Sequence, residues 1–208
     1  MMKKKELILK AARELFNQNG FSNVTIRMIA LKLNMSSGNL NYHFKKREAI
    51  FEALYFEMVL EFDTRVEALP VTEFSIKQIK DDISKSMERM IDYSFFWTDL
   101  YNLMSISEKV NLHFQKVYKT RIDGCLLLFE KLKEKDMMLN SSFETEYNLL
   151  AERMINHGNT WLYSNHIYTN DLSKRNIGYH RNILLSMLFP YLTLEGKKAF
   201  EIACPELF

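Results

Sequence analysis

Residues 25–44 constrain the fold more than any other part of the sequence. Their apolar residues recur at helical spacing, but this pattern is interrupted at one point. Apolar side chains recur at helical spacing behind Thr25, whose hydroxyl can cap a helix. Asn34 then ends the helix, because asparagine tolerates the left-handed backbone conformation found just past a helix end. One of two serines, Ser36 or Ser37, provides a second N-cap. The stretch therefore predicts two short helices joined by a tight turn.

The second of these helices has two unlike faces. Leu40 and Phe44 lie four residues apart and share the face that we expect to be buried. The opposite face carries Ser37, Gly38, Asn39, Asn41, Tyr42 and His43. It has no thick apolar layer that would prevent close approach to a nucleic-acid groove. Amide side chains bond base edges, whereas hydroxyl and imidazole groups bond phosphate oxygens. This face predicts a helix that reads double-stranded DNA.

The rest of the chain is expected to be helical as well. Only six Gly and three Pro occur among 208 residues, no β-hairpin signal is present, and a hydrophobic content of 47% is ample for a core. Periodicity and turn residues predict further helices at about residues 3–19, 47–69, 73–93, 95–105, 107–135, 142–166, 174–192 and 194–203. The predicted fold class is all-α, with a domain boundary near residue 48 that separates residues 1–48 from residues 49–208.

Charge is distributed unevenly between these two parts. Residues 1–50 contain ten Lys or Arg against three acidic residues, a net charge of +7, whereas the remaining 158 residues contain eighteen basic and twenty-three acidic residues, a net charge of −5. A basic end on a mildly acidic body is expected when one end meets phosphate groups. The alternative is that the lysine-rich end is merely solvated.

Short motifs in one register run through the first fifty residues. They are Ile8–Phe16, Gly20-Phe21, Thr25-Ile26-Arg27, Ile29-Ala30, Ser36–Leu40, Tyr42–Lys45 and Glu48-Ala49-Ile50. In this register the segment resembles the N-terminal domain of the tetracycline-repressor-like (TetR) family of bacterial transcription regulators. Three positions depart from the usual pattern: Asn34 replaces a common Gly, Asn41 an aromatic residue, and Lys46 a small polar cap. Since Asn41 lies on the reading face, it should change which operator is recognised.

The resemblance implies a one-component regulator, a repressor, that binds palindromic operator DNA as a homodimer and is released by a small hydrophobic effector. It implies an N-terminal three-helix helix-turn-helix domain and a C-terminal helical domain for ligand binding and dimerisation. Carried over position by position, it assigns base edges to Ser37, Asn39 and Asn41, and close approach to Gly38. It assigns phosphate contacts to Thr25, Arg27, Tyr42, His43 and Arg47. Activation instead of repression stays open, because no residue encodes where the operator lies.

Aromatic and methionine side chains gather in the second part of the chain. Apolar walls with a few polar groups are typical of small-molecule sites, and the resemblance implies a central pocket there. The candidate lining residues are Phe96, Trp97, Tyr101, Met104, His113, Phe114, Tyr118, His157 and Trp161. The alternative is that these bulky side chains simply fill a helical core.

Two late helices, at about 142–166 and 174–192, carry more apolar surface than one core face requires. We therefore expect part of this surface to be shared with a second subunit, and the resemblance implies a four-helix interface. The alternative is that both are interior helices of a monomer.

Other functional classes find little support. The histidines show no metalloprotease spacing, and no Gly-rich phosphate loop or nucleophile elbow occurs, so no enzyme, cofactor or metal is predicted. Cys125 and Cys204 lack metal-ligand spacing and no apolar run is long enough to span a membrane, which favours a reduced, cytoplasmic protein. The main rival is a ligand-binding or scaffold protein that retains the fold without sequence-specific DNA binding.

Overall fold

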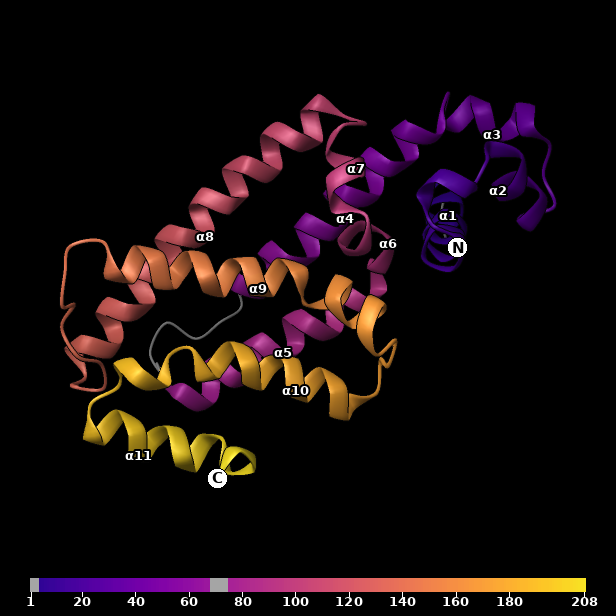
Figure 1. The fold of residues 1–208 in the computed structure, drawn as a ribbon. Coiled ribbons are helices and arrows are strands. Elements are labelled where there is room, and N and C mark those ends of the chain that lie inside the picture. Colours follow the sequence, from indigo (N-terminus) through magenta and orange to yellow (C-terminus); the bar gives the residue numbers. More distant parts are fainter. Residues whose placement is uncertain (1–3, 68–74) are drawn as a thin grey trace. The chain divides into compact units, whose positions relative to one another are not determined.

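The computed structural model describes residues 4–67 and 75–208, except for the side chains of residues 63–67. Within these ranges the chain is predominantly helical (Figure 1), and the β-type pairing is limited to an isolated bridge between Met138 and Leu192. The prediction of an all-α fold is confirmed. By their internal contacts the residues form two compact units, a first unit of residues 1–69 and 92–113 and a second unit of residues 70–91 and 114–208.

The first unit contains the predicted reading helices at one end of a long helix (Figure 1). In chain order its helices are α1 (Lys4–Asn19), a 3-10 turn (Phe21–Asn23), α2 (Ile26–Lys32), α3 (Ser37–His43), α4 (Arg47–Glu67), α6 (Ser94–Thr98), α7 (Leu100–Met104) and the start of α8 (Glu108–Glu134). Three predicted helix ends lie outside the described residues: those near residues 3, 69 and 73.

The ends of α2 and α3 follow the local sequence. The Thr25 hydroxyl accepts a hydrogen bond from the Met28 amide at 3.2 Å, and the Ser36 hydroxyl accepts one from the Asn39 amide at 3.1 Å. Asn34 has a φ of 52°, in the left-handed region that ends α2. The choice between the two serines is therefore settled in favour of the first. These three residues define a tight helix-turn-helix.

A chain of aromatic rings joins the helices of the first unit. Phe16 of α1 packs against Phe21 with ring centroids 5.1 Å apart, Phe21 against Phe51 of α4 at 5.6 Å, and Phe51 against Phe96 of α6 at 6.4 Å. All four side chains are buried. Since such pairs add attraction to the burial of apolar area, they hold α1, α4 and α6 together.

The single helix predicted at 95–105 is instead two short helices. The break lies at Asp99, whose backbone leaves the helical region with φ −131° and ψ 28°. The Asp99 carboxylate accepts a hydrogen bond from the side chain of Asn102 at 2.6 Å. Aspartate favours such breaks because its short side chain offers local hydrogen bonds that compete with the helix.

The second unit also consists of helices and short 3-10 turns. Its elements are α5 (Ile76–Asp92) up to residue 91, α8 from residue 114, α9 (Glu146–Tyr168), α10 (Lys174–Ser186), a 3-10 turn (Phe189–Tyr191), α11 (Leu194–Ala203) and a final 3-10 turn (Pro205–Leu207). α9 packs against α10 (Figure 1). The core includes Trp161, Leu162 and Leu185, which are almost fully buried.

Two predicted helices of the second unit are shorter than expected. α9 begins at Glu146 instead of residue 142, one turn later than expected, and the Glu146 carboxylate accepts a hydrogen bond from the Ser142 amide in the preceding segment. α10 ends at Ser186 and not at residue 192, and Pro190 lies in the 3-10 turn that follows. A proline has no amide hydrogen to donate and its ring crowds the preceding turn, so the α-helix cannot continue there.

His157 of α9 and His180 of α10 meet inside the second unit. Their ring centroids are 6.1 Å apart, and Nε2 of His157 lies 3.3 Å from the carbonyl oxygen of His180. Burial lowers the pKa of His157. Burial also lowers the pKa of His180, and the proximity of His157 lowers it further. Both rings therefore resist protonation in the folded state.

This pair predicts a protein that is less stable in acid. Below the ordinary histidine pKa of 6.5 the unfolded chain binds protons that the folded chain does not yet bind, so the free energy of unfolding should fall as the pH falls. Chemical denaturation at about pH 7.5 and about pH 5.5 measures the effect. His180→Gln should weaken the pH dependence, whereas His166→Gln, at an exposed position of α9, should leave it unchanged. Equal pH dependence of the wild type and His180→Gln would contradict this explanation.

Candidate nucleic-acid interface

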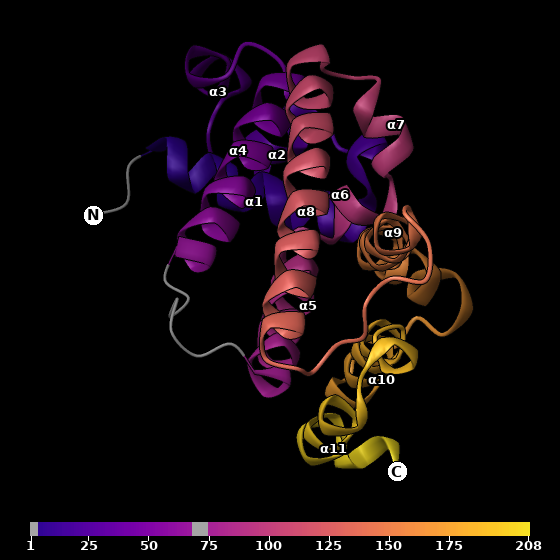
Figure 2. The same cartoon turned by 90° about the vertical axis from the view of Figure 1, so that its left-hand side faces the viewer.

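α3 lies at an edge of the first unit (Figures 1 and 2). The predicted inward face is confirmed, since Leu40 is fully buried and Phe44 is 9% exposed. On the other side Asn39 and Asn41 are exposed, and Tyr42 is 87% exposed. The helix therefore presents amide and hydroxyl groups outward over most of its circumference.

The N-terminal turn of α3 carries the first of the predicted base contacts. Ser37, Gly38 and Asn39 directly follow the capping residue Ser36, and in helix-turn-helix proteins the N-terminal residues of the second helix contact base edges. Ser37 is half-buried and the other two are exposed. At the opposite end of α3, the half-buried ring of His43 packs edge-on against Tyr42 with centroids 5.3 Å apart.

Two predicted phosphate contacts lie at the start of α2. Thr25 and Arg27 are both exposed. The Thr25 oxygen is used as the helix cap, but a hydroxyl has one hydrogen to donate as well, so Thr25 can still bond a phosphate oxygen. Arg27 carries a full charge at the same end of the helix, where the dipole also favours an anion.

The remaining phosphate candidate, Arg47, is held within the protein. Its guanidinium donates hydrogen bonds to the carbonyl oxygens of Phe21, Ser22 and Val24 at 3.0, 3.1 and 2.9 Å, and it lies 4.2 Å from the centroid of the Phe21 ring. Glu48 lies 3.8 Å away as an ion-pair partner. This geometry ties the start of α4 to the segment that leads into α2, a different role from the phosphate contact expected from the sequence.

Two further cations follow α3 directly in the chain. Neither was assigned a DNA contact from the sequence. Lys45 and Lys46 are exposed in the short segment between α3 and α4. By contrast, Lys32 of α2 is paired with Glu14 of α1 at 2.7 Å, and its hydrogen bond is the main reason that the pKa of Glu14 is lowered. The signal for the two lysines is simply their position directly after the reading helix.

Gly38 leaves open space on the outer side of α3. A Cβ atom placed there would meet only the Ser36 hydroxyl, at 4.0 Å. We expect Gly38→Ala to stabilise the folded protein by about 0.5 to 1 kcal/mol, because alanine is the better helix former. It should also weaken operator binding, because the added methyl group would project toward the groove.

The matched control for Gly38 is Gly124 of α8, where an added Cβ meets nothing within 4 Å. Gly124→Ala should stabilise the protein similarly and leave DNA affinity unchanged. Thermal unfolding and gel-shift titration measure the two effects. Undiminished operator affinity of Gly38→Ala would mean that this position does not approach DNA.

Five of the predicted ligand residues belong to the first unit: Phe96, Trp97, Tyr101, Met104 and His113. Phe96 and Trp97 are buried and pack against each other with centroids 5.0 Å apart, as part of the aromatic core. Tyr101 is 91% exposed, so its side chain lies on the surface and does not line a cavity of this unit. Nδ1 of His113 lies 2.9 Å from the Tyr55 hydroxyl of α4. Phe96 and Trp97 therefore fill the core of the first unit, which is the alternative to a ligand-lining role.

The other four candidates lie in the second unit: Phe114, Tyr118, His157 and Trp161. Trp161 is fully buried, and its indole N–H donates to the sulfur of Met90 at 3.2 Å, which again is a core role. Phe114, Tyr118 and His157 are half-buried. These three therefore keep part of their surface available for a ligand.

A hollow of about 410 Å³ lies beside α9. Its lining residues are Phe143, Glu146, Leu149, Glu152, Arg153, Asn156 and Tyr191. It shares no residue with the predicted ligand set.

A basic, capped helix-turn-helix with an exposed polar second helix defines a DNA-binding protein of the helix-turn-helix class. Comparison with known families is specific. Residues 8–54 match the model described as "Bacterial regulatory proteins, tetR family", and residues 57–200 match the model described as "Bacterial transcriptional repressor". The chain belongs to the TetR family of bacterial transcriptional regulators. Its members are DNA-binding regulators and not enzymes.

Individual relatives are distant. The chain is 28% identical to the HTH-type transcriptional regulator QacR of Staphylococcus aureus over 145 residues, which covers 62% of this chain and 71% of QacR. It is 29% identical to the HTH-type transcriptional regulator UidR of Escherichia coli over 76 residues, which covers 35% of this chain and 39% of UidR. The match with UidR therefore spans about two fifths of that relative's length.

Solved structures share the fold over almost the whole chain. A TetR-family transcriptional regulator from Marinobacter aquaeolei has a TM-score of 0.87 and 20% identity, covering 97% of this chain and 98% of that one. A transcriptional regulator from Saccharomonospora viridis, solved in complex with choline, has a TM-score of 0.70 and 19% identity, covering 91% and 97%. At this level of identity the likeness concerns the fold.

In the described part of the chain, no helix combines the length and the hydropathy that crossing a bilayer requires.

Proposed function

We propose that this protein is a homodimeric one-component repressor, acting in the cytoplasm, that binds palindromic operator DNA and releases it when a small molecule binds. The observation that supports the proposal most strongly is the capped α2–α3 pair, which holds Asn39, Asn41 and Tyr42 outward on a rigid helix. In functional terms we propose that residues 1–48 read the DNA and residues 49–208 bind the effector and dimerise.

Within the reading helix we assign base edges to Ser37, Asn39 and Asn41. Asparagine can bond adenine through two atoms at once, which distinguishes bases, whereas a phosphate contact only positions the protein. For phosphate contacts we propose Thr25, Arg27, Tyr42 and His43, with Lys45 and Lys46 adding positive charge beside them. Arg47 is excluded from this set because of its three internal hydrogen bonds.

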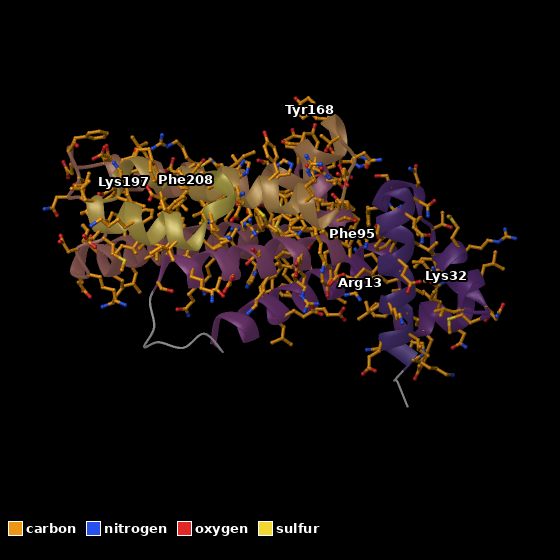
Figure 3. All side chains as sticks on the ribbon, turned by 90° about the horizontal axis from the view of Figure 1, so that it is seen from below. Arg13, Lys32, Phe95, Tyr168, Lys197 and Phe208 are labelled. Atoms are coloured by element: carbon orange, nitrogen blue, oxygen red, sulfur yellow. The ribbon has the colours of Figure 1, made fainter. Side chains whose placement is uncertain are left out.

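Dimerisation is supported by exposed apolar side chains on α9 and α10. Leu149, Tyr163 and Ile167 recur on one face of the helix and are 48%, 48% and 52% exposed. Tyr168 at the end of α9 is 81% exposed and points away from the ribbon (Figure 3), and Tyr179 of α10 is 61% exposed. A single chain leaves this surface in water, so a second copy is the simplest cover for it. Two reading helices can then address half-sites one helical turn, about 34 to 36 Å, or a multiple, apart.

A specific hydrogen-bonded link supports communication with the reading helices. The side chain of Asn17 in α1 donates to the carbonyl oxygen of Asp92 at 2.9 Å and accepts from the Phe95 amide at 3.1 Å. Asp92 is the last residue of α5, which otherwise belongs to the second unit. We propose that a change in α5 reaches α1 along the chain through Asp92. If α5 and α1 have two alternative arrangements, a ligand that binds one of them more tightly shifts the population toward it.

The proposal is tested by gel-shift titration of the full chain against its own upstream DNA and against random duplex, at about 50 mM and about 200 mM salt. Sequence-selective retention at both salt concentrations supports a regulator. Equal binding to both duplexes would instead support the rival function, a ligand-binding or scaffold protein that keeps the fold without operator specificity.

Asn41→Ala is expected to change which operator is preferred. The substitution removes one amide from the reading face, so affinity for the cognate site should fall by a factor of about 5 to 100, while affinity for random DNA stays the same. Selection from a randomised duplex library measures the preference. An unchanged preference would show that Asn41 does not contact a base edge.

A further inference from the structure

Arg121 is a cation on an otherwise largely uncharged face of α8. Phe114, Tyr118, Arg121 and Cys125 recur at spacings of four, three and four residues, which places them on one side of the helix. Two of them, Phe114 and Tyr118, are predicted ligand residues that remain half-buried. Arg121 itself is not among the ligand residues predicted from the sequence.

The guanidinium of Arg121 has a neutral partner and no acidic one. Its Nη1 donates a hydrogen bond to Oδ1 of Asn159 on α9 at 2.6 Å, and Asn159 is 7% exposed. Within the described part of the chain no Asp or Glu forms an ion pair with Arg121. A guanidinium carries five N–H donors. Because Arg121 is exposed, the donors that do not bond Asn159 are open to water and to a ligand.

The surroundings of Arg121 combine burial with access. Arg121 is an exposed residue, yet desolvation by the surrounding protein atoms lowers the pKa of its guanidinium. This combination is expected where an arginine side chain lines a recess that water enters. Gly158 lies directly alongside, since a Cβ atom there would be 3.6 Å from Nη2 of Arg121. The guanidinium remains charged, because arginine does not lose its proton in proteins.

We propose that Arg121, oriented by Asn159, binds the carboxylate of the effector, so that the effector is an organic anion with an apolar body and not a neutral hydrophobic compound. The inference rests on the proposed function, because it names the chemical class of the ligand that the regulator senses. The planar guanidinium matches a carboxylate through two parallel hydrogen bonds. Phe114 and Tyr118, on the same face of α8, supply apolar surface for the rest of the molecule.

The experiment compares matched acids and amides. Octanoate, decanoate, benzoate and naphthoate, each beside its primary amide, are titrated into the full chain while the thermal unfolding midpoint is recorded. At least one carboxylate should raise the midpoint in a saturable way and bind about 10- to 100-fold more tightly than its amide, the range expected for a charge-assisted hydrogen bond. Absence of a saturable carboxylate effect, or equal binding of an acid and its amide, overturns the proposal.

Variants locate the effect at Arg121. Arg121→Gln should abolish the preference for the acid, and Arg121→Lys should retain part of it, because the charge remains while the two-point geometry is lost. Lys119→Gln, which removes one exposed charge from the same helix, is the matched control and should behave as the wild type. Circular dichroism shows whether the variants are folded. Should Arg121→Gln fail to fold, the comparison of acid and amide binding to the wild type tests the proposal. A preference that persists in Arg121→Gln overturns the proposal.

The same samples separate this inference from the proposed function. Operator retention is measured on ligand-free protein, and the carboxylate that raises the midpoint is then added to the complex. If carboxylates bind through Arg121 but the protein shows no operator selectivity, the proposed function fails and the binding site stands. If the operator is bound selectively and carboxylates are not preferred, the repressor stands and the anion site is wrong.

Discussion

Gly196→Ala is expected to lower the free energy of unfolding by about 3 kcal/mol, and so to lower the thermal midpoint by about 6 to 12 °C. Gly196 lies inside α11, where an added Cβ atom would stand 2.0 Å from the carbonyl oxygen of Met137 and 2.9 Å from its carbonyl carbon. It would also meet Cβ of Leu192 at 3.1 Å. Since the two closest atoms belong to the backbone, a rotamer change cannot relieve the overlap.

The surrounding hydrogen bonds prevent an easy adjustment. The Met137 carbonyl accepts a hydrogen bond from the Thr193 amide at 3.1 Å, and the Thr193 hydroxyl accepts one from the Gly196 amide at 3.0 Å. α11 can make room only by leaving this position, which would also expose Phe200, now 1% exposed. The substitution therefore costs packing as well as hydrogen bonds.

Gly124→Ala supplies the control for this prediction. Gly124 is an exposed residue within α8, and its Cβ would meet nothing within 4 Å, so alanine there should stabilise the protein by about 0.5 to 1 kcal/mol. The two variants make the same chemical change with opposite expected signs. Chemical denaturation of both gives the difference, and a Gly196→Ala protein as stable as the wild type would mean that Met137 does not lie this close.

Local features of the fold could be predicted from the sequence because their causes are local. Thr25, Asn34 and Ser36 act on atoms within three residues of themselves, so the two helices and the turn between them follow from the order of residues. The split at Asp99 and the shortened ends of α9 and α10 also lie beside local groups, namely Asp99 itself, Glu146 and Pro190. Apolar periodicity alone does not locate such breaks to within a turn.

Long-range features could not be predicted in the same way. The requirement for glycine at residue 196 comes from Met137, and the role of Arg47 comes from carbonyl groups more than twenty residues earlier in the chain. For the ligand candidates, helical spacing marks a residue as apolar and inward but does not distinguish a filled core from a cavity wall. Phe96 and Trp161 belong to the core. The exposed Arg121 bonds a residue 38 positions later in the chain, a contact that helical spacing does not indicate.

Arg47→Ala is the second substitution with a large expected effect. It removes three hydrogen bonds from a charged group to the carbonyl oxygens of Phe21, Ser22 and Val24, together with the stacking on Phe21. We expect the free energy of unfolding to fall by about 2 kcal/mol, the usual cost of losing charge-assisted hydrogen bonds in a half-buried place. Operator affinity should fall too, because the segment that positions α2 and α3 loses its tie to α4.

The salt dependence of DNA binding separates this structural role from a direct phosphate contact. Loss of a phosphate contact lowers the slope of log affinity against log salt by about one per contact and leaves stability unchanged. Loss of the internal tie lowers stability and leaves the slope nearly unchanged, because the number of counterions released from the DNA on binding stays the same. Thermal unfolding and gel-shift titration at several salt concentrations give both quantities for the same protein.

Two neighbouring substitutions calibrate the measurement. Lys45→Ala removes an exposed charge close to α3 and should reduce the slope without loss of stability. Arg47→Lys keeps the charge, but a lysine has no planar fork to span three carbonyl groups and stacks poorly on Phe21, so it should resemble Arg47→Ala in stability. If Arg47→Lys were as stable as the wild type and Arg47→Ala showed the reduced slope, charge at this position would act on the DNA. The carbonyl contacts would then describe only the protein without its operator, in which the guanidinium, lacking a phosphate, turns to the nearest acceptors.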